Sequence, residues 1–257
     1  MHDVSTNDAA ISARGLGICY RRYLTRVSTL KEAVVSMFKG NTYEQFWALR
    51  NLDLTLNKGD RLGVVGPNGS GKTTLLKAIA GVLPPSEGKL AVNGRVVPLL
   101  GLGAGFKADL TGRENVILNG AIMGVSPQEM RRRFDGIVEF SGVGDFIDAP
   151  LSTYSSGMRA RLGFAVATDV DAELLLIDEV LAVGDAVFKE RAMRRIEKLF
   201  GQGTTVVFVS HAIAQVRRLC NRAIYLDEGK VVARGTVEEA TDEYMAFVEE
   251  QQETEAR

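Results

Sequence analysis

The chain has 257 residues, of which 46% are hydrophobic, and this size suits one large domain or one domain with subdomains. Its 31 Lys and Arg residues nearly balance its 32 Asp and Glu residues, so no global nucleic-acid footprint exists and we expect no nucleic-acid partner. Two cysteines and two histidines exclude a zinc cluster and disfavour a disulfide framework.

The N-terminal stretch from Met1 to Asp8 is polar and acidic, which does not fit a signal peptide. No apolar run approaches the ~20 residues needed to span a bilayer. We therefore expect a protein of the reducing cytoplasm that reaches a membrane only through another subunit.

Residue spacing predicts a first strand over Ile11–Tyr20 and a separate segment over residues 21–47. In that segment, Thr29–Glu32 is a capping box that opens a short amphipathic helix at about residues 28–39. Periodicity alone favours a helix that packs its apolar face on the domain. A strand over Trp47–Leu56 follows. Three arginines precede the helix: Arg21, Arg22 and Arg26.

The stretch Gly66–Thr73 fits the phosphate-binding loop G-x-x-x-x-G-K-[ST] at every fixed position. The apolar run Arg61–Val65 precedes it and helical spacing follows over Thr74–Ala80, which is the strand–loop–helix context of this motif. Main-chain N–H groups of such a loop surround phosphate oxygens, Lys72 reaches the β- and γ-phosphates, and the Thr73 hydroxyl ligates Mg²⁺. The loop alone indicates a nucleoside triphosphate. The expected contacts are Gly66, Pro67, Asn68, Gly69, Ser70, Gly71, Lys72, Thr73 and Thr74.

Residues 89–98 have the pattern of a strand and a turn around Asn93-Gly94. Helical patterns then run from Leu110 to Ser156, with one helix start at Thr111 and a capping box at Ser126–Glu129. This block predicts a helical subdomain, at about residues 107–160, inserted into an α/β core. We interpret Arg131, Arg132 and Arg133 as its solvated surface.

Two further apolar runs end in reactive side chains, at the strand ends where open α/β sheets bind ligands. Glu173–Glu179 is a predicted buried strand ending in two carboxylates, and Thr205–His211 is another ending in a histidine. Asp178 suits Mg²⁺ and Glu179 suits polarising the attacking water, while His211 suits sensing the γ-phosphate. A hairpin around Glu228-Gly229 and a charged, fraying helix over residues 237–257 follow.

The order of these motifs resembles the ATP-binding cassette (ABC) ATPases over residues 11–236. Tyr154–Met158 stands where that family has its L-S-G-G-Q signature and matches it in part. Tyr20 looks like the aromatic residue that stacks on adenine, and Asp185 looks like the dimer-interface aspartate. The resemblance implies an α/β fold: a P-loop (RecA-like) core with an antiparallel β subdomain and an inserted α-helical subdomain.

The same resemblance implies ATP and Mg²⁺ as cofactors, with Lys72, Glu179 and His211 as catalytic residues. It also implies a homodimer, in which three residues at a helix start meet the γ-phosphate held by the other copy. Those residues are Ser155, Ser156 and Gly157.

One departure from the family narrows the resemblance. The family usually has a glutamine between the phosphate loop and the helical subdomain, whereas the apolar Leu99–Phe106 stands there and no glutamine occurs from Pro84 to Leu110. The chain with this glutamine-free loop, its signature, the stretch Asp178–Asp185 and the inserted helix looks like one subfamily. These are the ATPase subunits of bacterial O-antigen, capsule and teichoic acid exporters.

That subfamily implies a peripheral subunit at the cytoplasmic face of the inner membrane. Its partner is an integral-membrane permease dimer that moves a lipid-linked polysaccharide. In this context residues 28–39 become a substrate-portal element, and the preceding arginines can meet lipid phosphates.

Other functions stay open. An importer or multidrug exporter subunit is one alternative, and a soluble ABC ATPase of DNA repair is another, although the latter needs a long coiled coil that residues 74–153 lack. Too few residues follow Arg234 for the β-sandwich that binds sugar in some O-antigen subunits. Either this protein lacks that recognition or the chain has been truncated.

Overall fold

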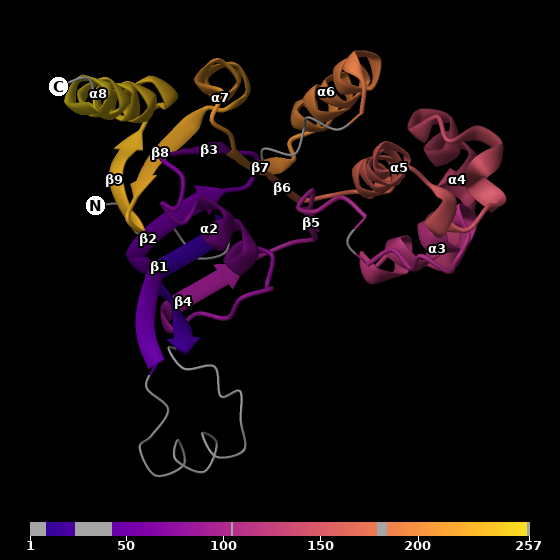
Figure 1. The fold of residues 1–257 in the computed structure, drawn as a ribbon, viewed down its shortest axis with the longest axis horizontal. Coiled ribbons are helices and arrows are strands. Elements are labelled where there is room, and N and C mark those ends of the chain that lie inside the picture. Colours follow the sequence, from indigo (N-terminus) through magenta and orange to yellow (C-terminus); the bar gives the residue numbers. More distant parts are fainter. Residues whose placement is uncertain (1–8, 24–42, 104, 179–183, 256–257) are drawn as a thin grey trace, which may run out of the picture.

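Two β-sheets and a block of helices make up the protein in the computed structural model (Figure 1). The structure describes residues 9–23, 43–103, 105–178 and 184–255. The predicted helix at residues 28–39, with Arg26, lies outside this part of the chain. So does Glu179.

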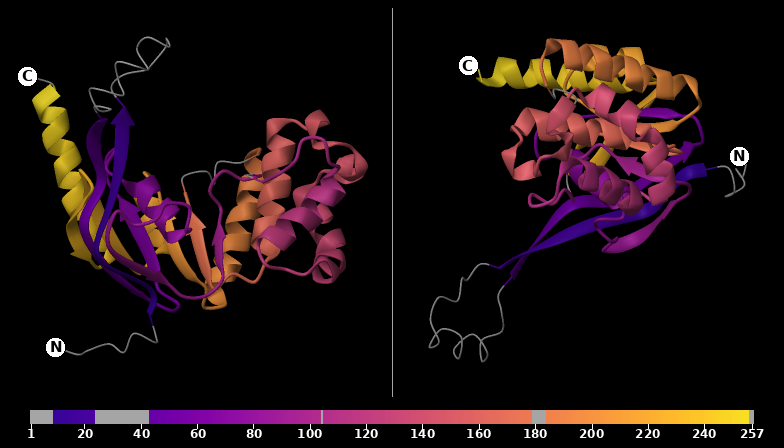
Figure 2. Two further views of the ribbon diagram at one scale, coloured as in Figure 1. Left: turned by 90° about the horizontal axis from the view of Figure 1, so that it is seen from below. Right: turned by 90° about the vertical axis from the view of Figure 1, so that its right-hand side faces the viewer.

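The first sheet is antiparallel and has the order β2-β1-β4. Its strands are β1 (Ala9–Tyr23), β2 (Tyr43–Asn57) and β4 (Glu87–Val92). The strands predicted at Ile11–Tyr20 and Trp47–Leu56 are confirmed and extend further, and Figure 2 shows β1 and β2 running out together beyond the rest of the body. Their inward side chains, such as Ile11 and Leu49, are fully buried.

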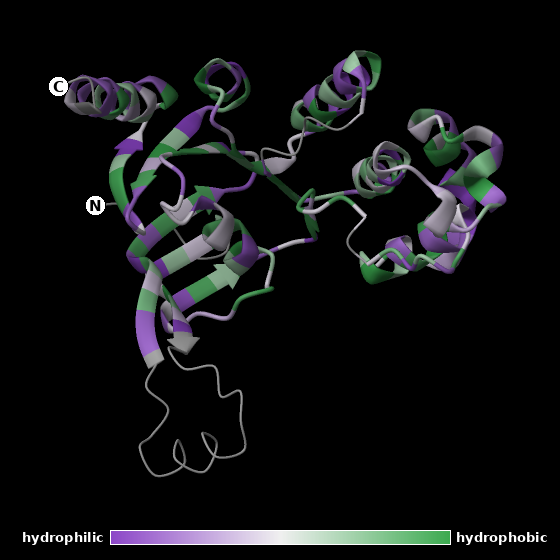
Figure 3. Ribbon diagram, viewed as in Figure 1, coloured by the Kyte–Doolittle hydropathy of each residue, from purple (hydrophilic) through white to green (hydrophobic). Residues whose placement is uncertain are grey.

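The second sheet has the order β5-β6-β7-β3-β8-β9, parallel except for the antiparallel edge strand β9. Its strands are β3 (Arg61–Val65), β5 (Val96–Pro98), β6 (Leu174–Ile177), β7 (Thr205–Val209), β8 (Arg222–Asp227) and β9 (Lys230–Gly235). Every residue of β6 and β7 is buried, as expected where layers cover both faces of a parallel sheet. Figure 3 shows hydrophobic residues along β3, β6 and β7 and mixed hydropathy around the helices.

Different elements cover the two faces of the second sheet. Helix α2 (Lys72–Ile79) and the first sheet bury one face, through residues such as Leu76, Val64 and Val207. The other face packs on α6 (Ala186–Gly201), α7 (Ile213–Leu219) and α8 (Val237–Glu255). The predicted C-terminal helix is confirmed as α8, and none of the described helices has the length and hydropathy needed to cross a bilayer.

The segment predicted as strand and turn over residues 89–98 joins the two sheets. Strand β4 pairs with β1 in the first sheet, whereas β5 pairs with β6 in the second. Between them, the Asn93 side-chain amide donates a hydrogen bond to the Ala9 carbonyl at 2.8 Å. This bond holds the crossing chain against the start of β1.

The helical lobe contains α3 (Gly112–Ile122), α4 (Pro127–Ser141), two short 3₁₀ turns η1 (Gly144–Asp148) and η2 (Leu151–Thr153), and α5 (Ser156–Asp169). Figure 1 places it on the far side of β5 from β9. The expected subdomain limit near residue 160 falls within α5, whose later residues, from Leu162 to Thr168, are buried in the main core.

Both predicted helix starts of the lobe are correct, but the two caps differ. Thr111 and Glu114 form a reciprocal capping box, and the hydrogen bonds from Thr111 lower the pKa of the Glu114 carboxyl. Ser126 accepts a hydrogen bond from the Glu129 N–H, yet the Glu129 carboxylate binds Arg132 and Arg133 instead of closing the box. The capping box predicted at Ser126 is therefore only half formed.

The prediction that Arg131, Arg132 and Arg133 are all solvated surface is wrong for Arg133. Its guanidinium donates to Glu129 Oε1 and to Asp171 Oδ2, each at 2.7 Å, and to the Asp169 carbonyl. The hydrogen bond from Arg133 holds the pKa of the Asp171 carboxyl below its usual value. Arg133 thus ties α4 to the chain that leaves α5 and enters β6.

We expect Arg133→Ala to lower the free energy of unfolding by about 1–2 kcal/mol, because it removes charge-assisted hydrogen bonds that are partly shielded from water. Arg131→Ala, on an exposed face of the same helix, should change it by less than about 0.5 kcal/mol. Urea unfolding followed by circular dichroism measures both. Equal effects of the two variants would show that the Arg133 bonds between α4 and the chain after α5 do not stabilise the protein.

Candidate functional site

The loop between β3 and α2 requires glycine for its positive φ angles and, at Gly66 and Gly71, also for close main-chain packing. Gly66, Gly69 and Gly71 have φ values of 146°, 82° and 106°, which residues with a Cβ rarely adopt. A Cβ on Gly66 would lie 2.0 Å from the Leu226 carbonyl oxygen, and one on Gly71 would lie 2.5 Å from that of Ala48. The loop is therefore pressed against β8 and β2, which fixes its shape.

The loop opens a helix whose first turn has no side-chain cap. Helices α3, α4, α5 and α6 each begin with a Thr, Ser or Asp side chain that accepts a main-chain N–H. The N-cap of α2 is Gly71, which provides no such acceptor. N–H groups at a helix start that lack a cap, together with the helix dipole, form an anion site.

Two polar side chains at the loop also fit a phosphate ligand. The Lys72 ammonium donates to the Gly66 and Pro67 carbonyls at 2.8 and 2.6 Å, so its charge lies within the loop. The Ser70 hydroxyl is buried and, in the described part of the chain, has no hydrogen-bond partner. The donors of this loop therefore suit a bound polyphosphate.

A cavity of about 290 Å³ extends from the loop to two strand ends. It brings together three residues that the sequence analysis singled out: Asp178 after β6, His211 after β7, and Tyr20 on β1. Its lining also includes Phe46, Ala48, Asn68, Gly69, Gly71, Lys72, Thr73, Thr74 and Val209.

Thr73 and Asp178 lie close together beside the phosphate loop. The Thr73 hydroxyl lies 3.5 Å from Asp178 Oδ2. The described residues contain no group of three His, Cys, Asp or Glu side chains that could hold a metal ion alone. A hard ion such as Mg²⁺, which is commonly bound by one or two protein oxygens plus phosphates and water, fits this arrangement.

The signature residues lie apart from this cavity. Ser155 caps α5 by accepting a hydrogen bond from the Met158 N–H at 3.1 Å, and Ser156 is exposed at the helix start. Asp185 likewise caps α6, accepting from the Phe188 N–H at 2.9 Å. None of these three residues lines the phosphate-loop cavity of its own chain.

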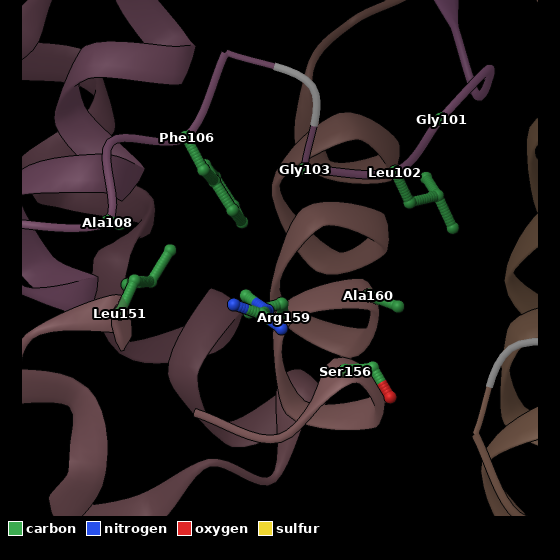
Figure 4. A pocket seen from close by; sticks show the side chains of 9 residues that line it. All are labelled: Gly101, Leu102, Gly103, Phe106, Ala108, Leu151, Ser156, Arg159 and Ala160. Atoms are coloured by element: carbon green, nitrogen blue, oxygen red, sulfur yellow. The ribbon is translucent and has the colours of Figure 1, made fainter. Parts of the chain in front are cut away.

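Ser156 instead borders a second cavity, of about 400 Å³. Figure 4 shows Phe106 and Leu151 pointing into this space from opposite sides, with Arg159 and Ser156 on α5. The apolar loop before Phe106, which replaces the expected glutamine, packs closely on α5, because a Cβ on Gly163 would lie 2.6 Å from the Gly103 nitrogen. The glutamine-free loop therefore contacts the signature helix directly.

Sequence reasoning missed three lining residues: Ala48, Val209 and the exposed Phe46. Phe46 lies directly opposite Tyr20 in the β1–β2 register, and its side chain is 57% exposed. The predicted strand began at Trp47, one residue after Phe46, so alternation along it gave no signal for Phe46. The observed strand begins at Tyr43 and puts Phe46 and Ala48 on one face.

The comparisons agree with this geometry. Residues 49–182 match the family model described as ABC transporter. The chain is 49% identical over 197 residues to "O-antigen export system ATP-binding protein RfbB" of Myxococcus xanthus, covering 77% of this chain and 45% of that protein. It is 39% identical over 212 residues to "Teichoic acids export ATP-binding protein TagH" of Listeria monocytogenes, covering 82% of this chain and 63% of that protein.

Among solved structures, a dimeric ATP-binding cassette in a post-hydrolysis state bound to ADP and Pi matches with a TM-score of 0.69. That match has 22% identity and covers 88% of this chain and 98% of the other. Fold and site together define an ATP-binding cassette, with the expected α/β core, antiparallel sheet and helical lobe. The chain belongs to the ABC transporter family. It spans about half to two thirds of the length of the two relatives named above.

We expect Gly71→Ala to destabilise the protein more than Gly81→Ala. Both glycines have positive φ, which costs a residue with a Cβ about 1–2 kcal/mol. A Cβ on Gly81 meets nothing within 4 Å, whereas one on Gly71 overlaps the Ala48 carbonyl oxygen. Thermal unfolding of the two variants measures the difference, and equal losses would show that the close packing at Gly71 is unimportant.

Proposed function

We propose that this chain is the ATP-hydrolysing subunit of an ABC exporter that moves lipid-linked O-antigen polysaccharide across the cytoplasmic membrane. The observation that carries the ATPase assignment is the cavity that joins the phosphate loop to Asp178 and His211. The higher identity to the O-antigen relative than to the teichoic acid relative favours the O-antigen substrate. Capsule or teichoic acid export is the alternative.

In this proposal the uncapped N–H groups of α2 and the Lys72 ammonium bind the β- and γ-phosphates of ATP. Thr73 and Asp178 hold Mg²⁺, which neutralises charge on the phosphates. His211 contacts the γ-phosphate from the end of β7, and Glu179 orients the attacking water. The proximity of Thr73, Asp178 and His211 around one cavity supports these roles.

The hydrolytic site is completed by a second copy. Ser155, Ser156 and Gly157 at the start of α5 supply donors to the γ-phosphate held by the partner, and Asp185 lies at the interface. Two features support this part: Ser156 and Asp185 are exposed, and neither reaches the nucleotide cavity of its own chain. Two such chains arranged head to tail would then enclose two ATP molecules.

The ATPase pair works on an integral-membrane permease dimer at the cytoplasmic face of the inner membrane, as a peripheral subunit. Closure of the pair on ATP and its reopening after hydrolysis drive the permease, which carries the polymer on its lipid. Residues 28–39 contribute to the entry of the lipid-linked substrate. Arg21, on the outer end of β1, is exposed and can meet lipid phosphates.

We expect Glu179→Gln to retain ATP binding, to lose at least about 99% of turnover, and to form a stable dimer with ATP, because the water loses its polarising carboxylate while the phosphate contacts remain. Phosphate release and light scattering after size exclusion measure both effects. Normal hydrolysis by this variant would refute the role of Glu179.

The Glu179→Gln variant also allows a test of the head-to-tail arrangement of the two copies. Adding Ser156→Arg to Glu179→Gln should abolish the ATP-dependent dimer, because a large cation at the start of α5 blocks the approach of the partner's loop. Ser152→Arg, at another exposed position nearby, serves as the matched control and should leave the dimer intact. A dimer that survives Ser156→Arg would contradict the shared site.

The transport function predicts that deletion of the gene leaves undecaprenyl-linked polymer inside the cell, since synthesis continues without export. Lipid extraction followed by sugar analysis detects this polymer, and its composition separates O-antigen from capsule or teichoic acid. Restoration by the wild-type chain but not by Lys72→Ala is the control. Co-purification with a permease for amino acids or metals would instead support an importer.

A further inference from the structure

Two exposed aromatic side chains border the nucleotide cavity. Tyr20 is 38% exposed and Phe46 is 57% exposed, and both line the cavity that contains the phosphate loop. Leaving a phenylalanine side chain in water costs free energy relative to burying it. A paired exposure of aromatic rings at the mouth of a site therefore points to a ligand surface.

Strand pairing sets the direction of both rings. Tyr20 and Phe46 are direct partners in the antiparallel β1–β2 ladder, and directly opposed residues have neighbouring side chains on one face of a sheet. Ala48, two residues along β2, lines the same cavity deeper in, where its carbonyl oxygen approaches Gly71. Ala48 is buried, whereas the two rings are exposed, so the rings lie on the solvent side of the cavity.

The cavity is therefore polar at one end and aromatic at the other. Lys72 and Thr73 open α2 at the phosphate loop and Asp178 follows β6, whereas Tyr20 and Phe46 are the exposed partners on the β1–β2 ladder. A nucleoside triphosphate has two matching ends, with charged phosphates at one end and a planar base at the other. Base–aromatic stacking contributes about 1–3 kcal/mol per base.

We propose that Phe46 is a second base-binding residue and that, beside Tyr20, it gives the nucleobase two aromatic contacts. This inference rests on the proposed nucleotide-binding function of the same cavity. Because larger rings cover more aromatic surface, the pair favours purine over pyrimidine nucleotides. Phe46 contributes affinity for the base and none for the phosphates.

Isothermal titration of the full chain with ATP, CTP and inorganic tripolyphosphate, each with Mg²⁺, tests this assignment. Phe46→Ala should weaken ATP binding by at least about fivefold, the lower limit of one stacking contact, and should reduce the preference for ATP over CTP. Its affinity for tripolyphosphate should equal that of the wild type. Phe46→Trp, which restores an aromatic surface, should recover ATP affinity.

Phe146→Ala is the matched control, because Phe146 is 54% exposed and lies on the helical lobe, outside this cavity. It should bind all three ligands like the wild type. Unchanged ATP affinity in Phe46→Ala, or an equal loss for ATP and tripolyphosphate, would overturn the role of Phe46 while the nucleotide site itself stands. Failure of the wild type to bind ATP would overturn the proposed function and this inference together.

Discussion

The site depends on the close approach of three stretches of main chain around the phosphate loop. Gly66 is pressed against the Leu226 carbonyl and Gly71 against that of Ala48, while the Gly229 N–H donates to the Ser70 carbonyl at 3.0 Å. The loop is thus held by β2 on one side and by the β8–β9 hairpin on the other. This packing gives the N–H groups of α2 one fixed direction before any ligand arrives, which lowers the entropic cost of binding.

The arrangement of the sheets follows from the same constraint. Strand β2 belongs to the antiparallel sheet and β8 to the parallel one, so the loop lies where the two sheets meet. The parallel strands β6 and β7 flank β3 on one side and deliver Asp178 and His211 to the same edge. The antiparallel sheet delivers the two aromatic rings. Each sheet therefore builds one end of the cavity.

The helical lobe is joined to this core through α5. Close contact between Gly163 and the loop at Gly103 binds one side of the helix. Arginine side chains hold the end of α5. Asp169 accepts a hydrogen bond from Arg195 of α6 at 2.6 Å, and Arg133 of α4 donates to the Asp169 carbonyl and to the Asp171 carboxylate. Helix α5 therefore connects the signature residues at its start to the chain that enters β6, the strand that precedes Asp178.

Local signals in the sequence determined the phosphate loop, the buried strands β3, β6 and β7, the cap at Thr111 and the β8–β9 turn. Each depends on neighbouring residues, whose conformational preferences act within one element. The tertiary structure alone decided that Phe46 faces the cavity, that Arg133 binds across to Asp171, and that β4 and β5 enter different sheets. These features depend on strand register and on contacts between distant segments, which short-range periodicity does not encode.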